Sequence, residues 1–441
     1  MSAIDGFVIA PKPTAHFGVG AIEQLPPIVR ATGAEAVVVV TDEALASAPA
    51  VATVRAVLAD AGLPARMFSG VHPNPTTDDV AAGAAAVAEV AAGAAAVVEA
   101  AAVAATLRPS APLAAPSAPA DPAAFVYSAA PSPAASPRPG VCPATRIALV
   151  AVGGGSPIDA AKGIAIAAVN PERGRDLDYR RSFTVPALPI VAVPTTAGPG
   201  AETNAFGVVT DPAARRKFYV GHASSMPAAA ILDPALTVGL PPAMTAVTGL
   251  DALTSALESY LSVRPNPWSD GIALQAIRMI ARHLPRACAD GTDLAARSQM
   301  LLAAHMAGVA IANTGPGPCR AIGHSLGGRW GVADGAALAA LLPGVLRFNL
   351  PVRTQRMAEV AFALGVGDTH ADTWLNAEAA IGAITALRDE VGLGRGIGDF
   401  GITEADFGQI AADTLDDEVL ADAPSPPCRD DIHAILLASA G

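Results

Sequence analysis

The sequence is poor in positive charge, and lysine is rare among its basic residues. Its 441 residues include 28 lysines and arginines against 40 aspartates and glutamates, which gives a formal net charge of −12 at pH 7. The only lysines are Lys12, Lys162 and Lys217. A surface this acidic repels phosphate backbones, so we expect no nucleic-acid partner.

Cysteines and export signals are also scarce. The four cysteines form no C-x-x-C pair; they are Cys142, Cys288, Cys319 and Cys428. This spacing is typical of a reducing cytosol and predicts no disulfide framework. The first ten residues carry Asp5 and no basic residue, unlike a secretory signal peptide. We therefore expect a cytoplasmic protein.

Long uncharged runs are few, and one of them resembles a membrane span in composition. Residues 81–106 are nearly all Ala, Val and Gly, interrupted by Glu89 and Glu99. Alanine contributes little to membrane insertion, and carboxylates oppose it. We predict a helix followed by low-complexity sequence rather than a transmembrane helix, and no membrane partner.

Apolar residues are abundant, and in the first half they form short runs. They make up 52% of the chain, which excludes a disordered protein, and 441 residues are enough for two domains. We predict strands at Ala36–Thr41, Ile147–Val152 and Leu188–Val193, with a helix at Val51–Ala61. Strands that alternate with helices indicate a parallel sheet.

The chain changes character between about residues 92 and 145. This stretch is rich in Ala, Pro and Ser, lacks periodicity and has few groups able to form a core. It predicts a disordered or loosely ordered surface insertion. A docking arm for a partner is the alternative interpretation.

From Pro241 onward the apolar pattern becomes helical. The predicted helices are Ala243–Val263, Ser269–Leu284, Ala295–Ala312, Asp334–Phe348 and Arg353–Leu364. We therefore divide the chain into an α/β domain, residues 1–240, and an all-helical domain, residues 241–441. A cleft between two such domains is a common place for a ligand.

Glycines follow the second predicted strand directly. The segment 153–162, GGGSPIDAAK, leaves that strand and begins a helix. Glycines let the backbone approach a pyrophosphate, and a helix N-terminus supplies N–H donors and a positive dipole end. Ser156 can both cap this helix and donate to phosphate. A plain strand-to-helix turn is the alternative. The candidate cofactor contacts here are Gly153, Gly154, Gly155, Ser156, Asp159 and Lys162.

Polar groups also follow the other two predicted strands. The segment 194–200, PTTAGPG, offers two hydroxyls at the carboxyl end of a strand, where open α/β sheets bind ligands. Asp42 follows the first strand; its carboxylate can accept from a ribose diol and would repel a 2′-phosphate, which favours NAD over NADP. Its alternative role is a helix N-cap. The further candidate cofactor contacts are Asp42, Thr195, Thr196 and Lys217.

Two other motif matches are interpreted as coincidences. The glycines of Gly392–Gly398 have dinucleotide-loop spacing, but no strand precedes them, so we predict a loop. Gly323-His324-Ser325-Leu326-Gly327 fits a G-x-S-x-G nucleophile elbow, which needs a preceding strand. The residues before it predict a poor strand, so a serine hydrolase is the less favoured alternative.

Taken together, the motifs resemble the iron-containing alcohol dehydrogenase family, which includes maleylacetate reductases and is related to dehydroquinate synthase. The resemblance covers nearly the whole chain apart from the insertion. It rests on VHPNPT (71–76), GGGSPIDAAK, PTTAGPGAET (194–203), the run over 231–262, and GHSLGG (323–328). It implies a Rossmann-like N-terminal domain, a helical C-terminal domain, a nicotinamide cofactor in the cleft and a homodimer.

The resemblance fails at the metal site. Members of the family usually hold their metal with an Asp, a His four residues later, and two further His. Asp251 matches the Asp, but Ser255, Arg320 and Asp334 stand where the three histidines belong. His324 matches a histidine that lies by the active site without normally binding the metal.

Arg320 makes a metal ion at this site unfavourable. A guanidinium stays protonated in proteins, and a divalent cation about 4 Å away would be repelled by roughly 8 kcal/mol at an effective dielectric constant of about 20. We infer that Arg320 replaces the metal, pairs with Asp251 or Asp334, and still offers donors to a substrate oxygen. A decayed site with a structural ion pair, or a residual or displaced metal, are the alternatives.

These residues favour a metal-independent oxidoreductase that transfers hydride between a nicotinamide and a carbonyl or alcohol carbon. Arg320 would polarise the oxygen, His324 would donate or relay a proton, and Asp251, Ser255 and Asp334 would complete the site. The cationic pocket suggests a small substrate with an anionic group. A lyase, decarboxylase or cyclase on the same scaffold is the main alternative, and a non-catalytic binding protein is the other.

Overall fold

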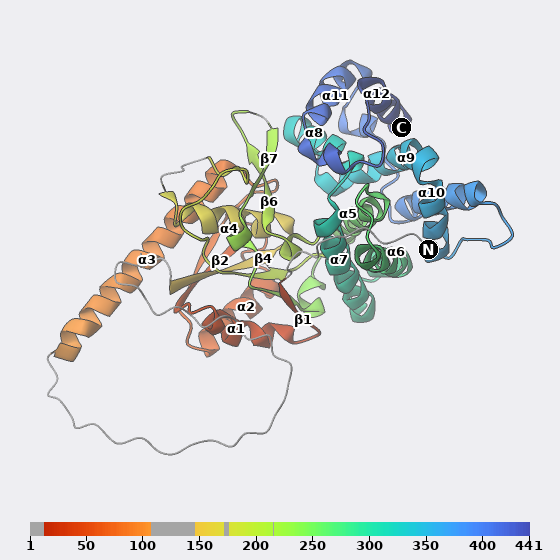
Figure 1. Cartoon of the computed structure of the whole chain (residues 1–441). Helices are drawn as coiled ribbons and strands as arrows, with labels where there is room; N and C mark the ends of the chain where they lie inside the picture. The colour runs from red at the N-terminus through yellow and green to blue at the C-terminus, as the bar shows by residue number, and fades with distance from the viewer. Residues whose placement is uncertain (1–12, 107–145, 172–175, 215) are drawn as a thin grey trace.

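The computed structural model describes residues 13–106, 146–171, 176–214 and 216–441. The N-terminal part forms a layered α/β domain, and the C-terminal part forms a domain of packed helices (Figure 1). The predicted fold class is therefore confirmed. The last strand of the sheet ends at Leu232 and the first long helix begins at Pro242, on either side of the boundary predicted at residue 240.

The first domain is built on a parallel sheet with the strand order β1-β8-β5-β4-β2-β3. Its strands are β1 (Thr14–Phe17), β2 (Ala36–Asp42), β3 (Ala65–Val71), β4 (Ile147–Gly153), β5 (Ile190–Pro194) and β8 (Ala229–Leu232). The three strands predicted from apolar runs are β2, β4 and β5, which are buried almost throughout because helices cover both faces of the sheet.

The strands of the main sheet that sequence reasoning missed lie at or near its edges. Most residues of β1 and β3 are exposed or half-exposed, so neither strand has an apolar run. Strand β8 is buried but only four residues long, which is too short for a clear pattern. Propensity and periodicity give little signal in such cases.

Helices α1 (Leu25–Ala31), α2 (Pro49–Asp60), α3 (Thr77–Thr106) and α4 (Gly155–Ala167) flank the sheet. Helix α3 projects away from the domain in Figure 1 and includes residues 81–106, which were predicted to begin as a helix. The helix continues through residues 92–106, so the low-complexity insertion was predicted to start too early. Alanine has the highest helix propensity, which explains the continuation. The rest of that prediction, residues 107–145, lies outside the described residues.

A two-stranded antiparallel unit links the two domains. Strands β6 (Phe206–Asp211) and β7 (Arg216–Gly221) pair with each other rather than with the main sheet. Strand β7 packs against α8 of the helical domain. It therefore carries its side chains to the boundary between the domains.

The helical domain buries an extensive apolar core. Its helices are α5 (Pro242–Leu261), α6 (Pro267–Ala289), α7 (Leu294–Thr314), α8 (Pro318–Trp330), α9 (Asp334–Leu364), α10 (Thr373–Glu390), α11 (Phe407–Leu415) and α12 (Arg429–Ala438). Two helices predicted separately are joined in α9, which bends at Arg353 two residues after Pro351. A proline removes one helical hydrogen bond, and here it kinks the helix without ending it.

Helices α7 and α9 are long and apolar enough, by length and composition, to cross a membrane. In this fold most of their apolar stretches are buried, 56% in α7 and 72% in α9. Both contribute residues to the core of the helical domain. Their apolar character is therefore explained by packing inside the protein.

Close backbone contact joins the loop after β5 to α7. Gly200 has a φ of +77°, and a Cβ atom there would lie 2.6 Å from the Cα of Gly308. Glu202 and His305 reinforce the junction, with the His305 Nδ1 2.9 Å from the Glu202 Oε1. This contact fixes the loop that carries the two threonines against the helical domain.

Candidate active site between the domains

The glycine segment forms the turn between β4 and α4, at the carboxyl edge of the sheet. Gly153 has a φ of +146°, and a Cβ there would come within 2.6 Å of the Pro157 ring. The helix begins at Gly155 with Gly154 as its N-cap and no side-chain capping bond. Ser156 therefore lies inside the first turn and does not cap the helix as predicted. Among the described residues its hydroxyl has no partner, so it is free to meet a phosphate together with the N-terminal N–H groups.

The threonine segment lies beside this turn because β4 and β5 are neighbouring parallel strands. The N–H of Thr195 donates to the carbonyl of Gly153 at 2.9 Å. Thr196 is close to Gly154, since a Cβ at Gly154 would be 3.2 Å from its hydroxyl oxygen. The hydroxyl of Thr195 is buried without a hydrogen-bond partner in the described structure. An unsatisfied buried hydroxyl at this edge is suited to a ligand that supplies the missing partner.

Asp42 ends β2 at the same edge of the sheet. Its Oδ1 accepts from the N–H of Leu45 at 2.8 Å, so it organises the turn after β2. It is not the helix N-cap of the alternative interpretation, because α2 begins at Pro49 with Ala48 as its N-cap. The residue is only half-buried. Its second carboxylate oxygen is left for a ribose hydroxyl, so the two roles are compatible.

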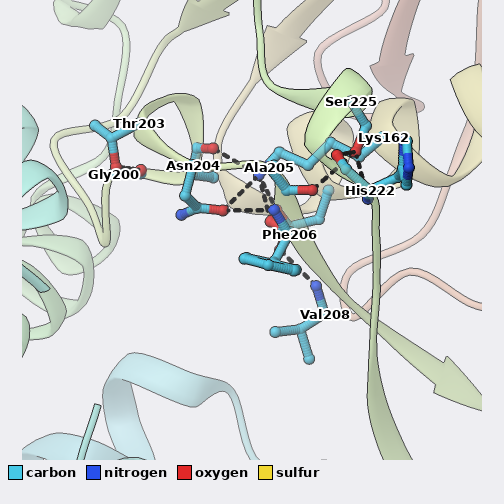
Figure 2. A network of polar contacts seen from close by, with 11 residues as sticks. Lys162, Gly200, Thr203, Asn204, Ala205, Phe206, Val208, His222 and Ser225 are labelled. Atoms are coloured by element: carbon cyan, nitrogen blue, oxygen red, sulfur yellow. Dashed lines mark hydrogen bonds and ion pairs between the residues drawn. The ribbon is translucent and has the colours of Figure 1, made fainter. Parts of the chain in front are cut away.

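Lys162 and Asp159 lie farther along α4 than Ser156. Figure 2 shows Lys162 among the polar groups of the segment that includes Asn204 and Phe206. The Lys162 ammonium is fully buried and donates to the carbonyls of Ala201, at 2.7 Å, and Phe206, and to the Asn204 side chain. It also pairs with Asp159, 3.3 Å away. Burial lowers the pKa of Lys162, and the carboxylate of Asp159 opposes that shift.

These contacts change the interpretation of Lys162 and Asp159. Asp159 also accepts from the N–H of Val208 at 3.0 Å, so both side chains hold the segment between β5 and β6 in place. The direct cofactor contact expected from the sequence is not open to Lys162, because position 162 lies two turns beyond the helix N-terminus with its ammonium enclosed by protein. We assign the pair a positioning role.

Arg320 occupies the centre of the site in the helical domain. One guanidinium nitrogen, Nη2, lies 2.6 Å from the Asp251 Oδ1 and 2.9 Å from the Ser255 hydroxyl oxygen. The Arg320 and Asp251 side chains are 13% and 7% exposed, so this is a largely buried ion pair. The predicted pairing of Arg320 is therefore present, with Asp251 as its partner.

Glu258 completes this group and was missed by sequence reasoning. Its Oε1 accepts from the N–H groups of Cys319 and Arg320 at the start of α8. Residues 251, 255 and 258 of α5 have the i, i+4, i+7 spacing of one helical face, and that spacing was the available signal. Glu258 thus anchors the helix turn that presents Arg320.

The charged groups of this cluster stabilise one another in their ionised forms. Burial raises the pKa of Asp251 and of Glu258, and the Arg320 guanidinium opposes both shifts. Burial alone would lower the pKa of Arg320, but Asp251 and Glu258 outweigh it and the pKa lies above the usual value. Arg320 is therefore a fixed positive charge in the interior.

Asp334, at the start of α9, pairs with Lys217 of β7. The Lys217 Nζ lies 2.5 Å from the Asp334 Oδ1 and 2.9 Å from the Asn74 Oδ1. Burial raises the pKa of Asp334, but Lys217 and the other nearby cations outweigh it, so the pKa is lowered. Lys217, expected from the sequence to contact the cofactor, forms an ion pair that ties the two domains together. Asn74 comes from the VHPNPT motif.

His324 lies one turn after Arg320 on α8. Its Nδ1 is 2.8 Å from the Asp417 Oδ2, which orients the ring, and its Nε2 has no partner among the described residues. Its neighbour Ser325 sits within a helix rather than after a strand, so the nucleophile elbow is excluded. The other coincidental match, Gly392–Gly398, forms a loop and a short 3-10 turn after α10, which confirms the loop prediction.

A cavity of about 170 Å³ opens between β7, α8 and the segment after α11. Lys217, Tyr219 and His324 line it, and its remaining wall is rich in charged side chains such as Arg329 and Glu418. Much of this charge is paired within the wall, for example Arg329 with Asp413. The cavity suits a small polar molecule next to the imidazole.

Known protein families match both halves of the chain. Residues 12–118 and 145–234 match the model for iron-containing alcohol dehydrogenase, and residues 245–440 match that for the C-terminal part of the Fe-containing alcohol dehydrogenase family.

Individual relatives agree with these matches. The "Probable alcohol dehydrogenase EutG" of Escherichia coli is 40% identical over 291 residues, 66% of this chain and 72% of that protein. The "NAD-dependent methanol dehydrogenase" of Bacillus methanolicus is 37% identical over 289 residues, 66% and 76% of the two chains. A solved 1,3-propanediol oxidoreductase superposes with a TM-score of 0.83 at 32% identity, covering 99% of this chain and 100% of that one.

Proposed function

The chain belongs to the iron-containing alcohol dehydrogenase family, and we propose that it is an NAD(H)-dependent oxidoreductase in which Arg320 replaces the metal ion. Membership makes it an enzyme of the alcohol dehydrogenase type in an NAD(H)-dependent family. Metal independence and a small, anionic carbonyl or alcohol substrate are the further parts of the proposal. We also propose that it acts in the cytoplasm as a homodimer.

One observation carries the proposal: the position of the Arg320 guanidinium. Only Nη2 is bonded, to Asp251 and Ser255, while the other guanidinium N–H groups have no hydrogen-bond partner among the described residues. A fixed cation with free donors can polarise a carbonyl oxygen and stabilise the alkoxide that forms from it. Those are the tasks of a Lewis-acidic metal.

The donor set at this position does not fit iron or zinc. Within the described ranges, no group of three or more His, Cys, Asp or Glu side chains could hold a metal ion. Asp251 and Asp334 are each already neutralised by a cationic side chain, Arg320 and Lys217 respectively. Iron and zinc prefer sites with imidazole or thiolate ligands, and a guanidinium adds repulsion. No step of the proposed reaction passes through a metal.

The groups at the sheet edge fit a dinucleotide. The N-terminus of α4, the Ser156 hydroxyl and the unsatisfied Thr195 hydroxyl can bind a pyrophosphate, and Asp42 can accept from a ribose. When bound, the nicotinamide would donate or accept a hydride. Arg320 would hold the substrate oxygen, and His324, oriented by Asp417, would relay a proton at its Nε2. A non-redox enzyme on this scaffold is the alternative.

Cofactor binding tests this proposal. Titration with NADH should enhance the nicotinamide fluorescence. NADPH should bind about tenfold more weakly than NADH, because the Asp42 carboxylate repels a 2′-phosphate. A tenfold difference in affinity is about 1.4 kcal/mol, which is modest for a like-charge contact near the surface. Asp42→Asn keeps an oxygen to accept from the N–H of Leu45 and removes the charge. It should therefore reduce the difference in affinity between NADH and NADPH. Absence of binding to either nucleotide at saturating concentration would overturn the oxidoreductase proposal.

A further inference from the structure

The hydroxyl of Tyr219 is a polar group of the cavity that the proposed reaction has not used. Tyr219 lies on β7 two residues after Lys217, so both side chains point to the same side of the strand. Both line the cavity together with His324. The Tyr219 ring meets the His324 ring edge to face, with centroids 5.7 Å apart and planes inclined by 70°. Tyr219 therefore stands directly beside the proposed proton relay.

The Tyr219 hydroxyl makes no hydrogen bond within the described part of the chain. The two other described tyrosines are both engaged through their hydroxyls, Tyr179 with Glu418 at 2.7 Å and Tyr260 with Glu359. A largely buried tyrosine usually finds a partner for its hydroxyl. Because Tyr219 lines the cavity, its hydroxyl is available to a molecule bound there.

The surroundings of Tyr219 keep its phenol protonated. Burial raises the pKa of Tyr219 well above its usual value, Asp417 raises it further, and Arg320 lowers it. The phenol is thus protonated throughout the neutral range. When its proton leaves, the Arg320 charge stabilises the phenolate that remains.

We propose that Tyr219 is a catalytic residue that donates its phenolic proton to the substrate oxygen during carbonyl reduction. This inference rests on the proposed function. It assigns the acid of the reaction to the Tyr219 hydroxyl in the cavity, and leaves His324 the role of orienting the Tyr219 ring and relaying protons.

The step balances in atoms and electrons. The carbonyl carbon receives a hydride from NADH, and the π electron pair of the carbonyl moves onto the oxygen. The O–H bond of Tyr219 breaks, its electron pair stays on the phenolic oxygen, and the proton forms the new O–H bond of the alcohol. The phenolate then regains a proton from solvent reaching the cavity. The products are the alcohol and NAD⁺, and alcohol oxidation follows the reverse course.

Tyr219→Phe tests the role of the hydroxyl, because it keeps the ring against His324. With NADH and a panel of small aldehydes, including some that carry a carboxylate, kcat should fall by about 100-fold or more, as expected for loss of a general acid. NADH affinity, measured by fluorescence, should stay unchanged. Tyr179→Phe is the matched control: it removes a hydroxyl from the adjacent ring, which contacts Tyr219 edge to face, and should leave kcat near that of the wild type.

The pH profile separates catalysis from a structural role. In the wild type, aldehyde reduction should stay level through the neutral range and decline only in strongly alkaline solution, where Tyr219 loses its proton. The residual activity of Tyr219→Phe should lack that decline. Retention of wild-type kcat by Tyr219→Phe, or an unchanged alkaline decline, overturns the inference and leaves the proposed function standing. Failure of the folded wild type to reduce any aldehyde overturns the proposed function, and this inference with it.

Discussion

Replacing Arg320 with methionine should lower kcat/KM for NADH-dependent aldehyde reduction by about 10² to 10³-fold, the usual cost of losing one donor to a developing oxyanion. Methionine has similar length but neither charge nor N–H groups. It leaves the carboxylates of Asp251 and Glu258 buried without the cation that stabilises them. NADH affinity should change little, because the proposed pyrophosphate site lies on the other domain. Steady-state kinetics with a fluorescence titration would separate the two effects.

Stability measurements control for misfolding of this variant. Losing one partner of a buried ion pair typically costs about 3–5 kcal/mol. Without Arg320 the pKa of Asp251 rises further, so the folded variant binds that proton more tightly than the unfolded chain does. Its free energy of unfolding should therefore fall as the pH increases.

A matched control removes another arginine from the same domain. Arg356→Met breaks the partly buried pair of Arg356 with Asp270 and its stacking on Tyr260, away from the cavity. It should destabilise the protein while kcat stays near the wild-type value. Equal activity losses in the two methionine variants would contradict a specific role for Arg320.

The triple variant Ser255→His, Arg320→His and Asp334→His should convert the site into a metal site. Together with Asp251, the new imidazoles supply three nitrogen ligands and one oxygen ligand from α5, α8 and α9, a set suited to zinc or iron. The wild-type side chains at positions 251, 255 and 320 already converge within hydrogen-bond distance. We expect one equivalent of zinc to remain bound through gel filtration, measured by elemental analysis.

The double variant Ser255→His and Asp334→His isolates the effect of the guanidinium. It gains two imidazoles but keeps Arg320, whose charge repels a divalent ion about 4 Å away by roughly 8 kcal/mol, twice the unit-charge value at an effective dielectric constant of about 20. It should therefore retain no zinc. Stoichiometric zinc in the double variant would show that Arg320 is not what excludes a metal.

The fold class was readable from the sequence because its decisive elements carry strong local signals. The buried strands β2, β4 and β5 are nearly continuous apolar runs, and the helical domain shows regular apolar spacing. Strands β6 and β7 were missed, since FGVVTD and RKFYVG are neither continuous apolar runs nor strict alternations of polar and apolar residues, and the two strands form a small separate sheet. That omission matters, because β7 brings Lys217 and Tyr219 to the site.

The candidate site was predictable where residues lie close in sequence or recur in a motif. Asp251 and Ser255 are one turn apart, as are Arg320 and His324, so their shared faces followed from helix geometry. The pairing of Lys217 with Asp334 joins residues 117 positions apart. That of His324 with Asp417 spans 93 positions. Such contacts depend on how the two domains and the last helices pack, which local patterns do not encode.

Turnover after exhaustive dialysis against a strong chelator tests the central claim most directly, with the metal content of the same sample measured alongside. We expect the protein, purified without added metal, to carry iron and zinc far below one equivalent and to reduce its aldehyde substrate with NADH at an undiminished rate after dialysis. Loss of activity on chelation, with recovery on adding iron or zinc, would contradict that claim.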